Sequence, residues 1–323
     1  MTYCVAMSLD AGIIFASDSR TNAGVDQIGR FSKMKVYAQE GERVIVTLSS
    51  GNLSITQNAL SILDQKARGG DSQLHLGNAQ SMFDVARLLG DSLREVKSRD
   101  GPYLMQNNVD ASANFLIGGQ VRGEPPRLFN VYGEGNFIEA TPDTCYFQIG
   151  ETKYGKPIID RVIKRTTSLV DATKCTMVSF DSTMRSNISV GLPIDLLVYE
   201  TDTLRIKLSR RIEETDPYFQ MVHTQWGEGL RRVFAQLPDP DWTWRPGARW
   251  PSASRCRTAP RTASTATSPS ARTRSGCAPR RTAARPCSGI RSTSRPSRTS
   301  STGSRTRTAT GWRGSSSPSA PTT

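Results

Sequence analysis

The sequence lacks the short motifs that mark most metal, redox and nucleotide sites. It has no C-x-x-C or H-x-x-H pair and neither the G-x-x-x-x-G-K-[ST] nor the G-x-G-x-x-G pattern. Of its only two histidines, His75 lies in a polar stretch and His223 has no Cys, Asp or Glu at ligand spacing. We therefore expect both to be structural or solvated, and we expect neither a metal ion nor an organic cofactor.

Long apolar runs are missing as well. None approaches the roughly 20 residues that a transmembrane helix needs. The start of the chain has no cationic segment, and Asp10 interrupts its apolar stretch, so no secretory signal is expected. The three cysteines of residues 1–250, Cys4, Cys145 and Cys175, are odd in number and widely spaced, so no disulfide framework is expected. These absences predict a cytoplasmic protein with no membrane partner.

Acidic residues are absent from the C-terminal part. The whole chain has 42 Lys and Arg against 29 Asp and Glu, but residues 251–323 hold 14 Arg and no Lys, Asp or Glu. Residues 1–250 therefore carry 28 basic and 29 acidic side chains, a net charge of −1. A near-neutral body gives no electrostatic case for nucleic-acid binding, and we expect none.

The composition changes abruptly near Trp244, which predicts a folded domain over residues 2–244 and a tail over 245–323. Of the 73 residues from Pro251 onward, 68 are Arg, Ser, Thr, Ala, Pro or Gly. Such a segment buries too little apolar surface to fold, so disorder is predicted. The tail is either a basic arm that binds a polyanion or the product of a reading-frame error in a GC-rich gene. The second interpretation is favoured.

Hydrophobic periodicity predicts strands and helices in blocks. Tyr3, Val5, Met7 and Leu9 alternate with smaller residues, and Asp10-Ala11-Gly12 indicates a turn before a returning strand. The remaining strands are expected at 33–37, 43–48, 113–118, 127–132, 137–141, 145–149, 194–199 and 204–208, and the helices at 53–68, 79–97, 157–169, 172–184 and from Asp216 onward. This order lacks βαβ alternation and favours an α+β fold with two antiparallel sheets face to face and helices outside both.

The first candidate for chemistry is Thr2. A small second residue permits removal of Met1, which leaves a free α-amine on Thr2. That amine has an ordinary pKa of about 7.7–8.0 and can act as general base for the hydroxyl of the same residue.

Two charged residues are expected close to Thr2. A hairpin turning at residues 10–12 places Thr2 opposite residues 18–20, so Asp18 lies where a charged partner belongs. Lys33 begins the next predicted strand. A lysine near the hydroxyl favours loss of its proton, and Asp18 can orient that lysine. Each residue alone is more simply explained as a surface charge; together with Thr2 they suggest a site.

The same residues carry a family resemblance. The N-terminal pattern resembles that of proteasome-type β subunits, N-terminal-nucleophile hydrolases with a four-layer αββα sandwich, and more closely that of the bacterial ancestral β subunits known as Anbu. The segments that carry it are Thr2–Val5, Ser17–Asp26, Ser32-Lys33, Ser49–Asn52 and Ser186–Leu196. It spans roughly residues 2–244 and leaves the tail without a counterpart.

The resemblance implies roles for individual residues. Thr2 is the nucleophile, Asp18 the orienting carboxylate and Lys33, rather than Lys35, the activating cation, because Lys33 keeps its place at the strand start. The backbone amide of Ser50, followed by Gly51, matches the oxyanion-hole position. In the supporting shell Glu151 replaces a serine, Asn187 replaces an aspartate, and Ser189 or Val190 occupies a second serine position.

The implied activity is hydrolysis of an amide bond, most simply in a peptide, by a protein that assembles with itself into a ring or a helical ring. Two alternatives stay open. The amide could belong to a small molecule or an isopeptide, with Glu151 or other charges recognising the substrate, or the chain could be a catalytically silent assembly subunit.

Overall fold

The computed structural model describes residues 2–22, 28–68 and 73–240. Strands β1 (Tyr3–Leu9) and β2 (Gly12–Asp18) form the predicted hairpin. Cys4 pairs with Ser17, which confirms the expected register and brings the end of β2 beside Tyr3.

Two five-stranded antiparallel sheets make up the centre of the fold. One has the order β10 (Tyr146–Gly150), β1, β2, β11 (Ile194–Glu200) and β12 (Ile206–Ile212). The other has the order β5 (Met34–Gln39), β6 (Arg43–Gly51), β7 (Ala113–Val121), β8 (Arg127–Val131) and β9 (Phe137–Glu139). A short hairpin, β3 (Arg20–Asn22) and β4 (Ile28–Arg30), extends from the end of β2.

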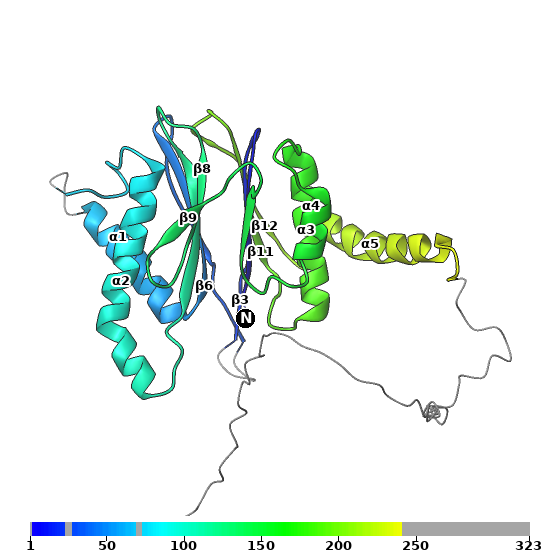
Figure 1. The fold of residues 1–323 in the computed structure, drawn as a ribbon, viewed down its shortest axis with the longest axis horizontal. Coiled ribbons are helices and arrows are strands. Elements are labelled where there is room, and N and C mark those ends of the chain that lie inside the picture. Colours follow the sequence, from blue (N-terminus) through cyan, green and yellow to red (C-terminus); the bar gives the residue numbers. More distant parts are fainter. Residues whose placement is uncertain (1, 23–27, 69–72, 241–323) are drawn as a thin grey trace, which may run out of the picture. The chain divides into compact units, whose positions relative to one another are not determined.

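Helices cover the outer face of each sheet, as Figure 1 shows. Helices α1 (Leu53–Arg68) and α2 (Met82–Gln106) lie on the β5–β9 sheet, and α3 (Lys156–Val162) and α4 (Leu169–Ser186) lie on the other. Helix α5 (Pro217–Gln236) packs against α4. The predicted α+β sandwich of four layers, αββα, is therefore confirmed.

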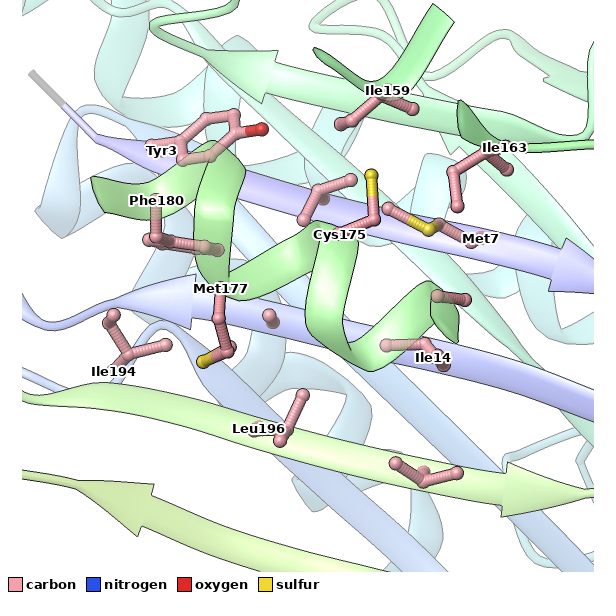
Figure 2. Close-up of a cluster of buried hydrophobic side chains, with 14 of the residues drawn as sticks. Tyr3, Met7, Ile14, Ile159, Ile163, Cys175, Met177, Phe180, Ile194 and Leu196 are labelled. Atoms are coloured by element: carbon pink, nitrogen blue, oxygen red, sulfur yellow. The ribbon is translucent and has the colours of Figure 1, made fainter. Parts of the chain in front are cut away.

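Alternation along β1 separates two cores. Tyr3, Val5 and Met7 contact the α3–α4 layer, whereas Cys4 and Ala6 lie between the sheets. Every residue of β1 is buried because both faces of the strand are covered. Figure 2 shows the helix-side core, in which the rings of Tyr3 and Phe180 lie 4.6 Å apart. This packing fixes the strand that carries Thr2 at its start.

Several element boundaries differ from the sequence prediction. Helix α2 runs to Gln106 rather than Lys97, because Leu104 packs against the α1–α2 core beyond the apolar repeat. The helix expected over 157–169 ends at Val162, and Ser168 caps a separate helix α4 by accepting a hydrogen bond from the backbone N–H of Asp171.

Strand β12 begins at Ile206 rather than Leu204, since Asp202 and Leu204 have positive φ angles of 63° and 48°. The β3–β4 hairpin was not predicted, because its strands are only three residues long and largely polar.

The described residues all fall within one unit that ends at Trp244. The tail predicted over residues 245–323 lies outside the described residues, so its interpretation stays a prediction. None of the described helices has both the length and the apolar character needed to cross a bilayer.

Candidate active site

A buried ion pair lies at the end of β2. Lys33 Nζ donates to Asp18 Oδ1 at 2.6 Å and to the backbone oxygen of Arg20 at 2.6 Å. Asp18 is 0% exposed and Lys33 6% exposed. The same Asp18 oxygen accepts the backbone N–H of Tyr3 at 3.0 Å. The Asp18 carboxylate, at the end of β2, is thus bonded to the start of β1. The same oxygen binds the Lys33 ammonium, which places Lys33 close to Tyr3, the residue after Thr2.

Burial and neighbouring charge have opposite effects on the pKa of Asp18. Burial raises the pKa of the Asp18 carboxyl, while the Lys33 ammonium and the Tyr3 N–H favour its ionised form. The backbone of Lys33 is also fixed, because the N–H of Ser49 in β6 donates to its carbonyl at 2.9 Å. Lys33 is therefore held at both ends, and its ammonium has one fixed position.

Thr2 is held against the edge of β10. The N–H of Glu151 donates to the Thr2 carbonyl at 2.6 Å. Gly150, with φ +85°, lies so close that an added Cβ would be 1.9 Å from the Thr2 oxygen. Only glycine combines that backbone angle with that approach. The position of Thr2 thus depends on a residue that has no side chain.

Thr2 and Lys33 both line one surface depression of about 390 Å³. Ser50 and Gly51, at the end of β6, line it too. Gly51 has φ +102°, and a Cβ there would lie 2.3 Å from the carbonyl oxygen of Ser112. The strand end predicted to supply the oxyanion hole therefore lies on the same depression as the predicted nucleophile.

Asn187 links the other two residues of the predicted supporting shell, Glu151 and Ser189. Asn187 Nδ2 donates to Glu151 Oε2 at 2.9 Å, and the N–H of Ser189 donates to Asn187 Oδ1 at 2.9 Å. Glu151 is buried, and its own N–H holds the Thr2 carbonyl. Val190, the alternative to Ser189, is buried in the helix-side core.

Neither Lys35 nor Cys4 joins this group. Lys35 forms an ion pair with Asp64 of α1. Cys4 is fully buried, and burial raises the pKa of its thiol, so it carries no reactive thiolate near Thr2.

The two histidines have structural contacts. The N–H of Gly77 donates to His75 Nδ1 at 3.0 Å, and His223 Nδ1 lies 2.6 Å from Asp181 Oδ1, which ties α5 to α4. Within the described ranges, no cluster of His, Cys, Asp and Glu has the arrangement of a metal site.

The structure adds partners that the sequence did not reveal. The Tyr3 N–H and the Arg20 carbonyl are backbone groups, so no residue type signals them. The lining of the depression also includes Asp110 and Ser112, which lie between α2 and β7, and Asn114 in β7. They lie more than 75 positions from Lys33 in the sequence and form no motif with it.

Comparison with known proteins supplies relatives of known structure. No protein-family model and no curated protein sequence matches the chain. Among solved structures, Anbu (ancestral β subunit) from Yersinia bercovieri is 51% identical, with a TM-score of 0.70. The helical assembly of the Anbu complex from Pseudomonas aeruginosa is 45% identical, with a TM-score of 0.71. Each match covers 75% of this chain and 100% of the other.

An Anbu (Gly-1) mutant from Hyphomicrobium sp. strain MC1 matches over the same shares at 46% identity, with a TM-score of 0.70. These identities extend over the whole length of each relative, and they agree with the four-layer fold and with the N-terminal residues described above. The chain therefore belongs to the Anbu family of ancestral β subunits.

Proposed function

We propose that the protein is an N-terminal threonine hydrolase that cleaves amide bonds, most simply in peptides, after removal of Met1. The observation that carries this proposal is the buried Asp18–Lys33 pair: Asp18 accepts the N–H of Tyr3, and Lys33 lines one depression together with Thr2. A buried pair of this kind contributes little net stability by itself, so a role in chemistry accounts for its placement.

The proposed reaction begins at the Thr2 hydroxyl. The free α-amine of Thr2 takes the Oγ proton while Oγ attacks the amide carbon, and the Lys33 ammonium favours the developing alkoxide. A C–O bond forms, and the negative charge on the carbonyl oxygen is stabilised by backbone N–H groups at Ser50 and Gly51. Asp18 orients Lys33.

Collapse of this intermediate breaks the C–N bond. The proton held by the amine passes to the leaving nitrogen, and the acyl group stays on Thr2 as an ester. Water then attacks the ester with the same amine as base, and the proton returns to Thr2 Oγ. The cycle needs no group beyond water and the residues named.

Turnover of fluorogenic peptide amides tests this proposal. The processed protein should hydrolyse members of a peptide library, and Thr2→Ala should lower kcat/KM by at least about 1000-fold. Thr2→Ser, which keeps a hydroxyl, should retain part of the activity. Hydrolysis that survives in Thr2→Ala would contradict the proposal. Modification of Thr2 by an electrophile, with no peptide cleaved, would point instead to a small-molecule amide or an isopeptide.

We further propose that the protein assembles with copies of itself in a cytoplasmic ring or helical ring. The relative from Pseudomonas aeruginosa is described as a helical assembly. Helix α5 exposes four large apolar side chains near its end, which are Leu230, Val233, Phe234 and Leu237. The free thiols of Cys4, Cys145 and Cys175 fit a reducing compartment. Light scattering should show that the wild type forms a large assembly. The Phe234→Asp variant should form a species of smaller mass.

A further inference from the structure

The described lining of the depression is polar and includes one carboxylate, Asp110, that forms no ion pair. Among the described side chains that line it, Leu53 is the one large aliphatic group, and most others bear hydroxyl, amide or carboxylate groups. An apolar substrate side chain gains little binding free energy from such a lining, whereas a side chain that donates hydrogen bonds can be satisfied there.

The two charged side chains on this lining differ in one respect. Lys33 is neutralised by Asp18 at 2.6 Å, so the pair presents little net charge. Asp110 forms no ion pair with a lysine or arginine of the described ranges; Lys97, which pairs with Glu134 at 3.6 Å, acts on it only as a more distant positive charge. Among the described side chains of the depression, Asp110 is therefore the carboxylate that no ion pair neutralises.

Hydrogen bonds hold Asp110 in its ionised form. The N–H of Ser112 donates to Oδ1 at 2.9 Å, and the Ser112 hydroxyl donates to Oδ2 at 2.5 Å. These bonds lower the pKa of the Asp110 carboxyl, so it is an anion at neutral pH.

The loop that carries Asp110 is tied to the end of β6. Asn52 Nδ2 donates to the Asp110 carbonyl at 2.8 Å, and the Asn52 N–H donates to the Ser112 carbonyl at 2.7 Å. Asn52 directly follows Ser50 and Gly51, the proposed oxyanion site. The carboxylate thus has a fixed position relative to the place where a substrate carbonyl is expected.

We propose that this depression accepts amide substrates in which the residue before the scissile bond has a cationic side chain, such as arginine or lysine. Asp110 is the carboxylate that binds this cation. This inference rests on the proposed function and specifies its substrate class. A cation on the substrate is attracted to the Asp110 carboxylate, whereas an acidic group there is repelled. Because Asp110 is exposed to solvent, the preference is modest and weakens with salt.

The test compares two peptide amides that differ only at the residue before the scissile bond, arginine in one and citrulline, its uncharged analogue, in the other. The wild type should favour arginine in kcat/KM by about fivefold at low salt. Asp110→Asn should bring the ratio to about one. Asp143→Asn, which removes an exposed carboxylate at a separate depression, should leave the ratio unchanged. A ratio of one in the wild type would overturn the proposal.

A binding measurement separates this proposal from the proposed hydrolysis. Titration of the Thr2→Ala protein with each peptide, followed by calorimetry or NMR, needs no turnover. Tighter binding of the arginine peptide that depends on Asp110 supports the substrate class even if the wild type cleaves neither peptide. Equal binding of both peptides, or binding of neither up to millimolar concentration, overturns it.

Discussion

Asn187 donates its side-chain N–H to the buried carboxylate of Glu151, 2.9 Å away. Proteasome-type β subunits, by the resemblance set out above, have an aspartate and a serine at these two positions. The structure shows that the two differences are in contact. A carboxylate at 151 is satisfied by an amide at 187, so the two replacements compensate each other.

This contact predicts the effect of Asn187→Asp. The variant keeps the oxygen that accepts the Ser189 N–H but places a second carboxylate against Glu151. Two ionised carboxylates in contact repel each other, so the variant should lose about 1–3 kcal/mol more stability at pH 8, where both are ionised, than at a pH low enough for them to share a proton. Urea unfolding at pH 5 and pH 8 measures this loss. Adding Glu151→Gln should restore stability at pH 8; a loss equal at both pH values would contradict the account.

Lys33 and Lys35 offer a matched comparison of activity. Lys33→Ala removes the cation beside Thr2 and should lower kcat/KM by at least about 100-fold. Lys35→Ala removes a cation two positions away that pairs with Asp64 and should change kcat/KM by less than about twofold. Steady-state kinetics on one fluorogenic amide decides between them, and comparable losses in both variants would refute the assignment of Lys33.

The same lysine should matter for stability. Lys33→Met leaves the Asp18 carboxylate buried without its partner, which costs about 3–5 kcal/mol. Replacing Asp18 by Asn in addition removes the buried charge and keeps an acceptor for the Tyr3 N–H. The double variant should therefore recover most of the loss in chemical denaturation. A double variant as unstable as Lys33→Met would show that the cost does not come from the unpaired charge.

Gly150 is predicted to control the position of Thr2. Gly150→Ala forces a Cβ toward the Thr2 carbonyl in a backbone conformation that alanine disfavours, so it should cost at least about 1 kcal/mol. A displacement of Thr2 by about 1 Å should lower turnover by about 100-fold. Gly101→Ala is the control, because Gly101 lies inside α2 with nothing within 4 Å of an added Cβ and should gain about 0.5–1 kcal/mol. Unchanged turnover in Gly150→Ala would disprove this role.

Asp216 makes the stability of α5 depend on pH. Burial alone would raise the pKa of its carboxyl, but the N–H of Phe219 at 3.0 Å and Arg210 at 2.6 Å outweigh it and lower the pKa. The carboxylate should thus stabilise the fold above its unfolded pKa of about 3.9 and lose that effect as pH falls through the lower folded value.

Asp216→Asn keeps a capping oxygen and removes the charge. It should cost about 1 kcal/mol at pH 7 and little near pH 2. Unfolding free energies of both proteins from pH 2 to pH 7 measure the difference, and a difference independent of pH would count against this interpretation.

The strands and helices could be predicted from the sequence where apolar residues recur at the spacing of a strand or a helix. Alternation at Tyr3, Val5 and Met7 predicted β1 because the strand lies between two layers. The turn at residues 10–12 then predicted that Asp18 lies beside the start of β1. These are local relationships, and local geometry determines them.

The rest depends on contacts between distant segments. The pairing of Glu151 with Asn187 joins β10 to the end of α4, and Asp110 reaches the depression from a loop after α2. No periodicity links such positions, because tertiary packing alone brings them together. The β3–β4 hairpin was not predicted for a different reason: its short polar strands have no alternation of apolar and polar residues.

The central claim is that Thr2 works as a nucleophile with a free amine. Intact mass spectrometry before and after treatment with a peptide epoxyketone tests it directly, because this electrophile reacts with both the amine and the hydroxyl of an N-terminal threonine. The account predicts a protein without Met1 that gains one adduct, and no adduct in Thr2→Ala. Retention of Met1 in the purified protein, or an adduct that persists in Thr2→Ala, would contradict it.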